Sequence, residues 1–419
     1  MLPDAASSSA PPAASSASAP LAAGAAAPLP VRSIAFLAAA AFASAANLRI
    51  SDPLLPQVAG EFGVGAGAAS IIVTSYTVAY GAMQVVYGPI GDRVGKYRVA
   101  ALTTFVAALA TLGCAAAPSL VGLAIARFLT AAAACAVIPL ALAWIGDVVP
   151  FDQRQPVLSR FISGQIAGMV VGQAAGGVLG DRLGWRAVFV ALAGVHLLAG
   201  LALVARMRVD PLTRRGGVAG ASLDPLVVVR QFAALLRRPW VAVIVATVGL
   251  EGTLFFGAFA YVGSALRHRF QLSFTLVGLV LASYGVGGLA YTLGARRMLA
   301  RWGERGLVRR GGALMALGFA SLAFAPRLPP VVLGIAASGL GFYMLHNTLQ
   351  SNATQMAPEQ RGVGIALFAA TLFVGQSLGV AVAAPVVDRW GEAPIFVGAA
   401  LGLLALAFYF SHKLSSRPA

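Results

Sequence analysis

Long apolar segments recur along the chain and are separated by short polar stretches. A helix needs about 20 residues to cross the hydrocarbon layer of a bilayer. Twelve segments have roughly this length or more, at about 33–54, 69–90, 99–117, 120–148, 156–180, 185–205, 239–264, 273–295, 307–326, 330–354, 362–386 and 393–411. The pattern predicts an all-α membrane protein with twelve transmembrane helices.

Composition agrees with this prediction. Of the 419 residues, 59% are hydrophobic and 11% are charged, and the mean hydropathy is +0.83. A soluble domain carries about 25% charged residues. The two cysteines, Cys114 and Cys135, both fall inside predicted spans. We therefore expect neither a disulfide framework nor a zinc site.

The net charge of +16 is distributed unevenly along the chain. If twelve spans place both termini on one side, 22 of the 30 Lys and Arg residues lie on that side, six lie on the other, and Arg49 and Arg127 lie inside spans. Basic residues concentrate on the cytoplasmic side of membrane proteins. We expect both termini in the cytoplasm, and the charge reflects topology rather than nucleic-acid binding.

The two halves of the chain resemble each other. GDRLGWRAVF at 180–189 returns as VDRWGEAPIF at 387–396, and at nearly the same offset Arg93-x-Gly95 falls on Arg301-x-Gly303. Parallel repeats of this kind occur in transporters that bind substrate between two bundles. The predicted parts are a disordered cytoplasmic tail (1–31), a six-helix bundle (32–206), a cytoplasmic linker (207–238), a second six-helix bundle (239–411) and a short tail (412–419).

The segment GPIGDRVGKYR, residues 88–98, lies in the predicted turn between the second and third spans. It resembles the signature loop of the major facilitator superfamily at Gly88, Asp92, Arg93, Gly95, Lys96 and Arg98. The resemblance implies that fold, with two pseudo-symmetric six-helix bundles, and a loop that latches the bundles together. Asp147 matches the acidic partner of that latch. The alternative is that the basic residues only anchor the topology.

A second resemblance concerns the direction of transport. GQIAGMVVGQAAGG at 164–177 is similar to the antiporter motif of the drug/proton branch at Gly168, Gly172, Gly176 and Gly177, but Gln173 occupies the position of that motif's proline. Arg127 stands where that branch has a membrane-embedded arginine. The segment at 47–64 resembles the corresponding segment of bacterial arabinose-efflux-like permeases. The resemblance implies efflux; plain helix packing through small residues is the alternative for the glycines.

Several polar residues fall on the spans that line the central cavity in this fold. Ionisable residues inside a membrane are costly and mark functional sites by default. Here they are Arg49, Asp52, Arg127, Glu251 and His346. Neutral candidates for the cavity wall are Asn47, Tyr76, Tyr80, Gln84, Tyr343, Asn347, Gln350 and Gln376, for which interhelical hydrogen bonding is the alternative.

Two carboxylates compete as the proton-coupling group. Asp52 follows Arg49 by three residues, so a local ion pair would keep it charged. Glu251 has no basic residue one helical turn away, and burial in apolar surroundings favours its neutral form. We expect Glu251 to carry the proton, with His346 as its exchange partner and Asp52 in reserve.

These features predict a secondary transporter of the bacterial inner membrane, most simply a proton-coupled antiporter that exports a small organic solute as a monomer. An uptake symporter, a lipid flippase of the same fold and a channel stay open. Neither GxxxxGK[ST] nor HExxH occurs in the sequence, so we expect no enzyme activity, no cofactor and no resident metal. The expected partners are the substrate, protons and the bilayer.

The topology can be tested by cysteine labelling from outside intact cells. The charge distribution predicts that Ser222→Cys, in the linker, is labelled only after permeabilisation, whereas Gln271→Cys is labelled directly. Labelling of Ser222→Cys in intact cells would overturn the orientation.

Overall fold

The computed structural model describes residues 29–214 and 225–416. This part of the chain is helical, with no β-strand within it. The first half contains α1 (Val31–Arg49), α2 (Leu55–Phe62), α3 (Ala66–Ala69), α4 (Ile71–Val94), α5 (Lys96–Ala116), α6 (Leu120–Ala134), α7 (Val137–Val148), α8 (Phe151–Val209) and the 3-10 turn η1 (Pro211–Arg214).

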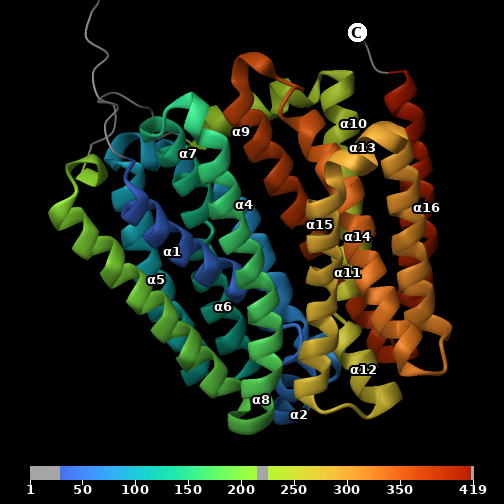
Figure 1. Cartoon of the computed structure of the whole chain (residues 1–419). Helices are drawn as coiled ribbons and strands as arrows, with labels where there is room; N and C mark the ends of the chain where they lie inside the picture. The colour runs from blue at the N-terminus through green and yellow to red at the C-terminus, as the bar shows by residue number, and fades with distance from the viewer. Residues whose placement is uncertain (1–28, 215–224, 417–419) are drawn as a thin grey trace, which may run out of the picture.

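The second half begins at the linker. It contains α9 (Pro225–Leu236), α10 (Pro239–Glu251), the π-helical turn η2 (Gly252–Phe256), α11 (Gly257–Phe259), α12 (Val262–Phe270), α13 (Phe274–Phe324), α14 (Leu328–Ala353), the 3-10 turn η3 (Pro358–Gln360), α15 (Arg361–Trp390) and α16 (Ala393–Ser415). In Figure 1, α9 and the C-terminus lie at one end of the molecule, here called the linker end, and α2 and α12 lie at the other, called the far end.

Among the described residues, ten helical stretches are long and apolar enough to cross a membrane. Two of them, α8 with 59 residues and α13 with 51, are each interrupted by one glycine in a non-helical conformation, Gly184 and Gly303. These glycines lie close to the boundaries predicted between neighbouring spans. Each glycine therefore separates two helical segments, and the chain changes direction there.

The sharp turns share one sequence pattern, Arg-x-Gly. Gly95, Gly184, Gly303 and Gly391 each follow such an arginine by two residues, and each has a positive φ, between 63° and 107°. Only glycine adopts this conformation without steric cost. The repeat seen in the sequence therefore marks four equivalent turns, two in each half of the chain.

Helices approach so closely at several glycines that their backbones touch. A Cβ on Gly172 of α8 would lie 2.7 Å from the Ala46 Cα of α1. Gly168 meets α1 in the same way, and Gly176 meets Ile50, directly after α1. Gly177 instead meets Gly278 of α13, across the two halves of the chain. Small residues permit this packing in membranes, where the hydrophobic effect does not drive helices together.

At the far end, two aspartates from the repeated segments join the halves. Asp388, near the end of α15, accepts hydrogen bonds from the backbone N–H groups of Gly67 and Ala68 at 2.8 and 3.0 Å. Its counterpart Asp181 accepts a 2.7 Å hydrogen bond from the hydroxyl of Thr275, at the start of α13. Each carboxylate thus binds at the N-terminal end of a helix from the other half, where free N–H groups and the helix dipole favour an anion.

The predicted linker contains a helix that the sequence analysis did not anticipate. Residues 225–236 form the helix α9, and α8 extends to Val209, beyond the predicted boundary at 206. The predicted tail at 1–31 lies outside the described residues up to 28, and α1 begins at Val31.

The backbone contact at Gly172 gives a stability prediction. Gly172→Ala inserts a methyl group against Ala46, and overpacking of this kind typically costs about 1–3 kcal/mol. We expect the thermal midpoint of the purified protein in detergent to fall by several degrees. Gly194→Ala is the matched control, because a Cβ there meets nothing within 4 Å and alanine favours a helix. Equal midpoints for the two variants would contradict the contact.

Asp388 and Asp181 give two predictions, and each variant serves as the control for the other. In Asp388→Ala, the amide hydrogens of Gly67 and Ala68 should exchange with solvent faster because they lose their acceptor. Asp181→Ala should leave those two amides protected and instead expose the start of α13. Hydrogen–deuterium exchange followed by mass spectrometry measures both segments in one experiment. Unchanged exchange at residues 66–70 in Asp388→Ala would rule out the hydrogen bonds.

Candidate functional site

Glu251 ends α10, and its side chain is fully buried. Its carboxylate Oε2 lies 2.8 Å from Nδ1 of His346 on α14. The other oxygen, Oε1, has no hydrogen-bond partner among the described residues. A buried carboxylate with a single partner is costly to keep charged, so this contact decides which proton arrangements the site can hold.

Aromatic rings surround the pair. The imidazole of His346 is stacked on Phe342, with ring centroids 4.9 Å apart, and lies 5.4 Å from Phe368. The side chain of His346 is 13% exposed, against 0% for Glu251. Protons therefore have easier access to the histidine than to the carboxylate.

The turn η2 follows Glu251 directly and has π-helical hydrogen bonding. Its first residue, Gly252, packs against α15, where a Cβ would lie within 2.4 Å of the Leu372 carbonyl oxygen. Isolated π turns inside α-helices occur often at functional sites. The tight contact with α15 holds Glu251 at its position beside α14.

A second polar group joins α1 to α8. Arg49 Nη1 lies 3.7 Å from Asp52 Oδ2, and the amide of Gln173 donates to the same oxygen at 3.3 Å. The guanidinium also lies over the ring of Phe256, 4.1 Å from its centroid. Arg49 and Gln173 line one small enclosed space together with Tyr284 and Tyr343. The halves of the chain therefore meet at a layer of polar and aromatic side chains.

Arg127 lies elsewhere, inside the first half. It is 1% exposed and donates from Nη1 to both the side-chain oxygen and the backbone oxygen of Asn47, at 2.6 and 3.2 Å. Its guanidinium stacks on Tyr76, 4.0 Å from the ring centroid. The guanidinium of Arg127, on α6, thus has partners on α1 and α4. The geometry fits a helix-joining role, and the structure does not bring Arg127 to Glu251 by any contact among the described residues.

The neutral residues predicted to line the cavity differ in how deeply they are buried. Tyr80 is buried and packs on Phe373 of the other half at 4.4 Å. Gln376 is buried too, and its Oε1 has no hydrogen-bond partner among the described residues. Gln84 and Asn347 are half-buried and Gln350 is exposed. The predicted cavity residues thus extend from a closed layer around Arg49 towards the linker end.

The signature-like loop centres on Lys96. Its ammonium lies 2.6 Å from Asp147 Oδ2 and 3.4 Å from Asp92 Oδ1. Both aspartates therefore pair with the same lysine. Arg93 and Arg98 are exposed, and Gly95 makes the turn with φ 107°. All three paired charges lie within the first half.

The antiporter-like segment is a packing surface in the structure. Gly168 and Gly172 contact α1, and Gly176 contacts Ile50 directly after it. The helix continues without interruption through Gln173, since the break inside α8 is at Gly184. Glutamine thus provides a hydrogen bond to Asp52 where a proline would have bent the helix.

Sequence reasoning missed Tyr284, which lies in the enclosed space beside Arg49. A single tyrosine within the glycine-rich segment 283–288 was the available signal. No cluster of three or more potential metal ligands occurs in the described ranges.

A model of the Major Facilitator Superfamily matches residues 37–380 of this chain. The chain belongs to that superfamily. It is therefore a multi-pass integral membrane protein of a transporter family. The recognition made from the signature-like loop is confirmed.

Individual relatives agree with this assignment. The uncharacterized MFS-type transporter YceJ of Bacillus subtilis (strain 168) is 25% identical over 373 residues, covering 87% of this chain and 90% of that protein. A probable sugar efflux transporter of Helicobacter pylori (strain G27) is 27% identical over 261 residues, covering 62% and 64%.

A solved structure shows the same fold. The crystal structure of a mutant of the nucleoside transporter NupG superposes with a TM-score of 0.76 at 14% identity, covering 91% of this chain and 99% of that one.

Proposed function

We propose that this superfamily member is a proton-coupled antiporter that exports a small organic solute. The observation that carries the proposal is the contact between Glu251 and His346, a titratable pair buried among aromatic rings. The relative named as a probable sugar efflux transporter supports the direction. Alternating access would present this pair to one side of the membrane and then to the other.

The proposed topology has twelve crossings in two six-helix bundles, with the linker end in the cytoplasm. As straight helices, the 59 residues of α8 and the 51 of α13 would extend about 88 and 76 Å. The hydrocarbon layer is only about 30 Å thick, so each fits as two crossings that meet at its glycine break. The positive charge of the predicted cytoplasmic segments supports the orientation.

The pair can hold one or two protons. With one proton, the Oε2–Nδ1 contact is a strong hydrogen bond in either arrangement, neutral acid with neutral imidazole or carboxylate with imidazolium. A second proton leaves donors on both sides of the contact and a net positive charge in an apolar site. A solute that binds better to one of these states shifts the proton equilibrium by its difference in affinity.

Protons moving inwards provide the energy for export. One proton crossing 100 mV releases about 2.3 kcal/mol, and each pH unit adds about 1.4 kcal/mol. Together these sustain a solute gradient of several hundredfold for each proton exchanged.

One closed state is consistent with such a cycle. The contacts of Gly177 with Gly278 and of Asp388 with Gly67 join the halves at the far end, which is periplasmic in the proposed orientation. Separation of these contacts would open that side.

The test uses Glu251→Gln, which keeps the shape of the side chain but cannot titrate. In everted membrane vesicles with an acidified lumen, the wild type should release protons when sugars or nucleosides from a panel are added, and Glu251→Gln should not. Downhill solute exchange should partly survive in the variant, because the cavity is retained.

Two further variants make the result specific. Glu304→Gln, outside the pair, should keep normal coupling, and Asp52→Asn should impair it less than Glu251→Gln. Normal uphill transport in Glu251→Gln with loss in Asp52→Asn would move the proton site to α1. Normal transport in both would remove proton coupling through these carboxylates.

A further inference from the structure

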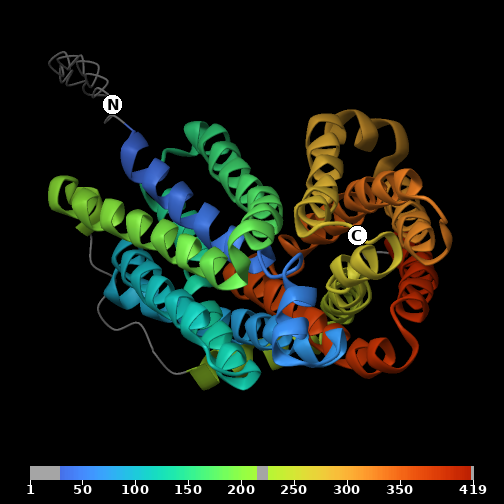
Figure 2. The same cartoon turned by 90° about the horizontal axis from the view of Figure 1, so that it is seen from below.

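The linker helix α9 passes along the outside of the linker end. It contacts α4 of the first half and α10 and α15 of the second. In Figure 2, seen from the far end, α9 lies largely hidden behind the other helices, and short parts of it are visible near the lower edge of the molecule. In the proposed orientation the linker end is at the level of the cytoplasmic headgroups of the bilayer.

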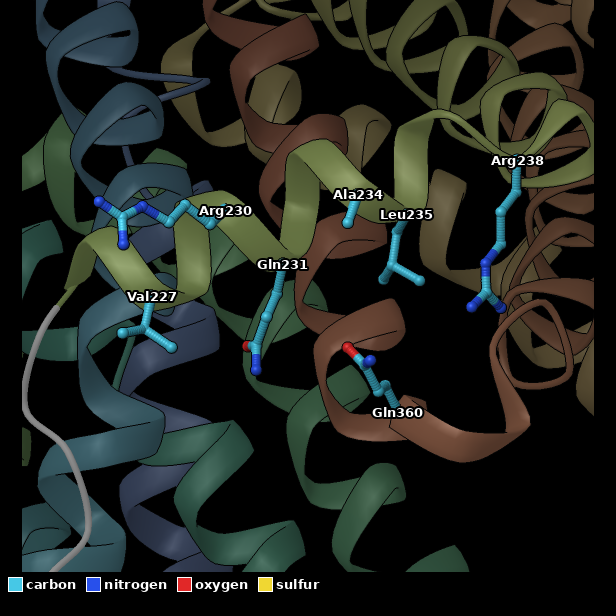
Figure 3. A pocket seen from close by; sticks show the side chains of 7 residues that line it. All are labelled: Val227, Arg230, Gln231, Ala234, Leu235, Arg238 and Gln360. Carbon is cyan, nitrogen blue, oxygen red and sulfur yellow. The ribbon is translucent and has the colours of Figure 1, made fainter.

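A cavity of about 330 Å³ opens beneath α9. Its polar lining consists of two arginines, Arg230 and Arg238, and two glutamines, Gln231 from α9 and Gln360 from η3. In Figure 3 the carboxamides of Gln231 and Gln360 extend into the space between α9 and η3, Arg238 points down at one end of this space, and the side chain of Arg230 at the other end extends outwards, away from the glutamines. The cavity is large enough for a phosphate group with its glycerol.

The charges of the cavity favour an anion. None of the described residues that line it is acidic. Arg238 forms a 2.5 Å ion pair with Glu359 at the rim, which balances one cation and leaves the charge of Arg230. Guanidinium groups bind phosphate oxygens through paired N–H donors, and carboxamide N–H groups add further donors.

An apolar stripe lies beside this polar lining on the same helix. Leu226, Val229 and Leu236 are 60%, 52% and 42% exposed. Their spacing of three and seven residues places them on one face of α9. A helix with exposed apolar and basic residues together is typical of the boundary between headgroups and acyl chains.

We propose that this cavity binds the phosphate headgroup of an anionic phospholipid, with the acyl chains along Leu226, Val229 and Leu236. Basic pockets at the cytoplasmic ends of transmembrane helices bind such headgroups. The apolar stripe is the reason for choosing a lipid over a soluble phosphate compound. The proposal rests on the orientation given under the proposed function but not on proton coupling.

Lipid binding to the purified full-length protein in detergent, measured by native mass spectrometry, tests the proposal. Phosphatidylglycerol should bind at least about tenfold more tightly than phosphatidylcholine, which has no net charge. Arg230→Gln should abolish this preference, and Arg305→Gln, a basic residue at the same end but outside the cavity, should keep it. Leu226→Ser combined with Val229→Ser should weaken binding of both lipids.

Three outcomes would contradict the proposed lipid site. Equal affinity for the two lipids removes the role of charge, and equal loss in Arg230→Gln and Arg305→Gln indicates a diffuse basic surface. Competition by glycerol 1-phosphate at the affinity of the lipid indicates a soluble ligand instead. A thermal midpoint for Arg230→Gln within about one degree of the wild type ensures that the fold is retained. Glu251→Gln should bind phosphatidylglycerol normally, so failure of proton coupling and failure of this site remain distinguishable.

Discussion

Direct backbone contact between helices at glycine residues is the constraint on which the rest of this structure depends. Apolar side chains gain little from one another when lipid is equally apolar, so close packing holds the helices together. Gly172 sets α1 against α8, and Gly252 sets the turn after α10 against α15. The first contact places Arg49 and Asp52 beside Gln173, and the second places Glu251 opposite His346. A larger side chain at either glycine would move the polar residues that neighbour it.

Two buried ionisable side chains, Arg127 in the first half and Glu251 in the second, differ in how many partners they have. Arg127 donates hydrogen bonds to two oxygens of Asn47, and its guanidinium is stacked on Tyr76. These contacts hold the side chain in one position. Glu251 has one side-chain partner, the imidazole of His346, and its other carboxylate oxygen has no hydrogen-bond partner among the described residues. A fully satisfied ion stabilises the fold around it, whereas a carboxylate with one titratable partner changes its contacts whenever a proton arrives. The buried arginine Arg127 therefore has more hydrogen-bond partners than the buried carboxylate Glu251.

The sequence predicted the helices well because long apolar segments and Arg-x-Gly turns are local signals. Gly184 and Gly303 were placed close to the boundaries of predicted spans for this reason. Depth along a helix is also local, so the similar depths of Glu251 and His346 followed from counting residues. Direction around a helix is not local, so the contacts of Arg127 with Asn47 and Tyr76 could not be predicted from the spacing of residues. The helix α9 was missed because its short apolar run lies within a basic, proline-containing linker.

The π turn after Glu251 has one consequence of its own. Such a turn contains one residue more than an α-helical turn, and this extra residue can shift along a helix without unwinding it. Each residue that the shift passes rotates about the helix axis by about 100°, since 3.6 residues make a full circle. Glu251 lies directly at the N-terminal edge of the turn. A shift by one position towards the N-terminus would rotate the carboxylate of Glu251 away from α14, while the preceding residues of α10 stayed in place.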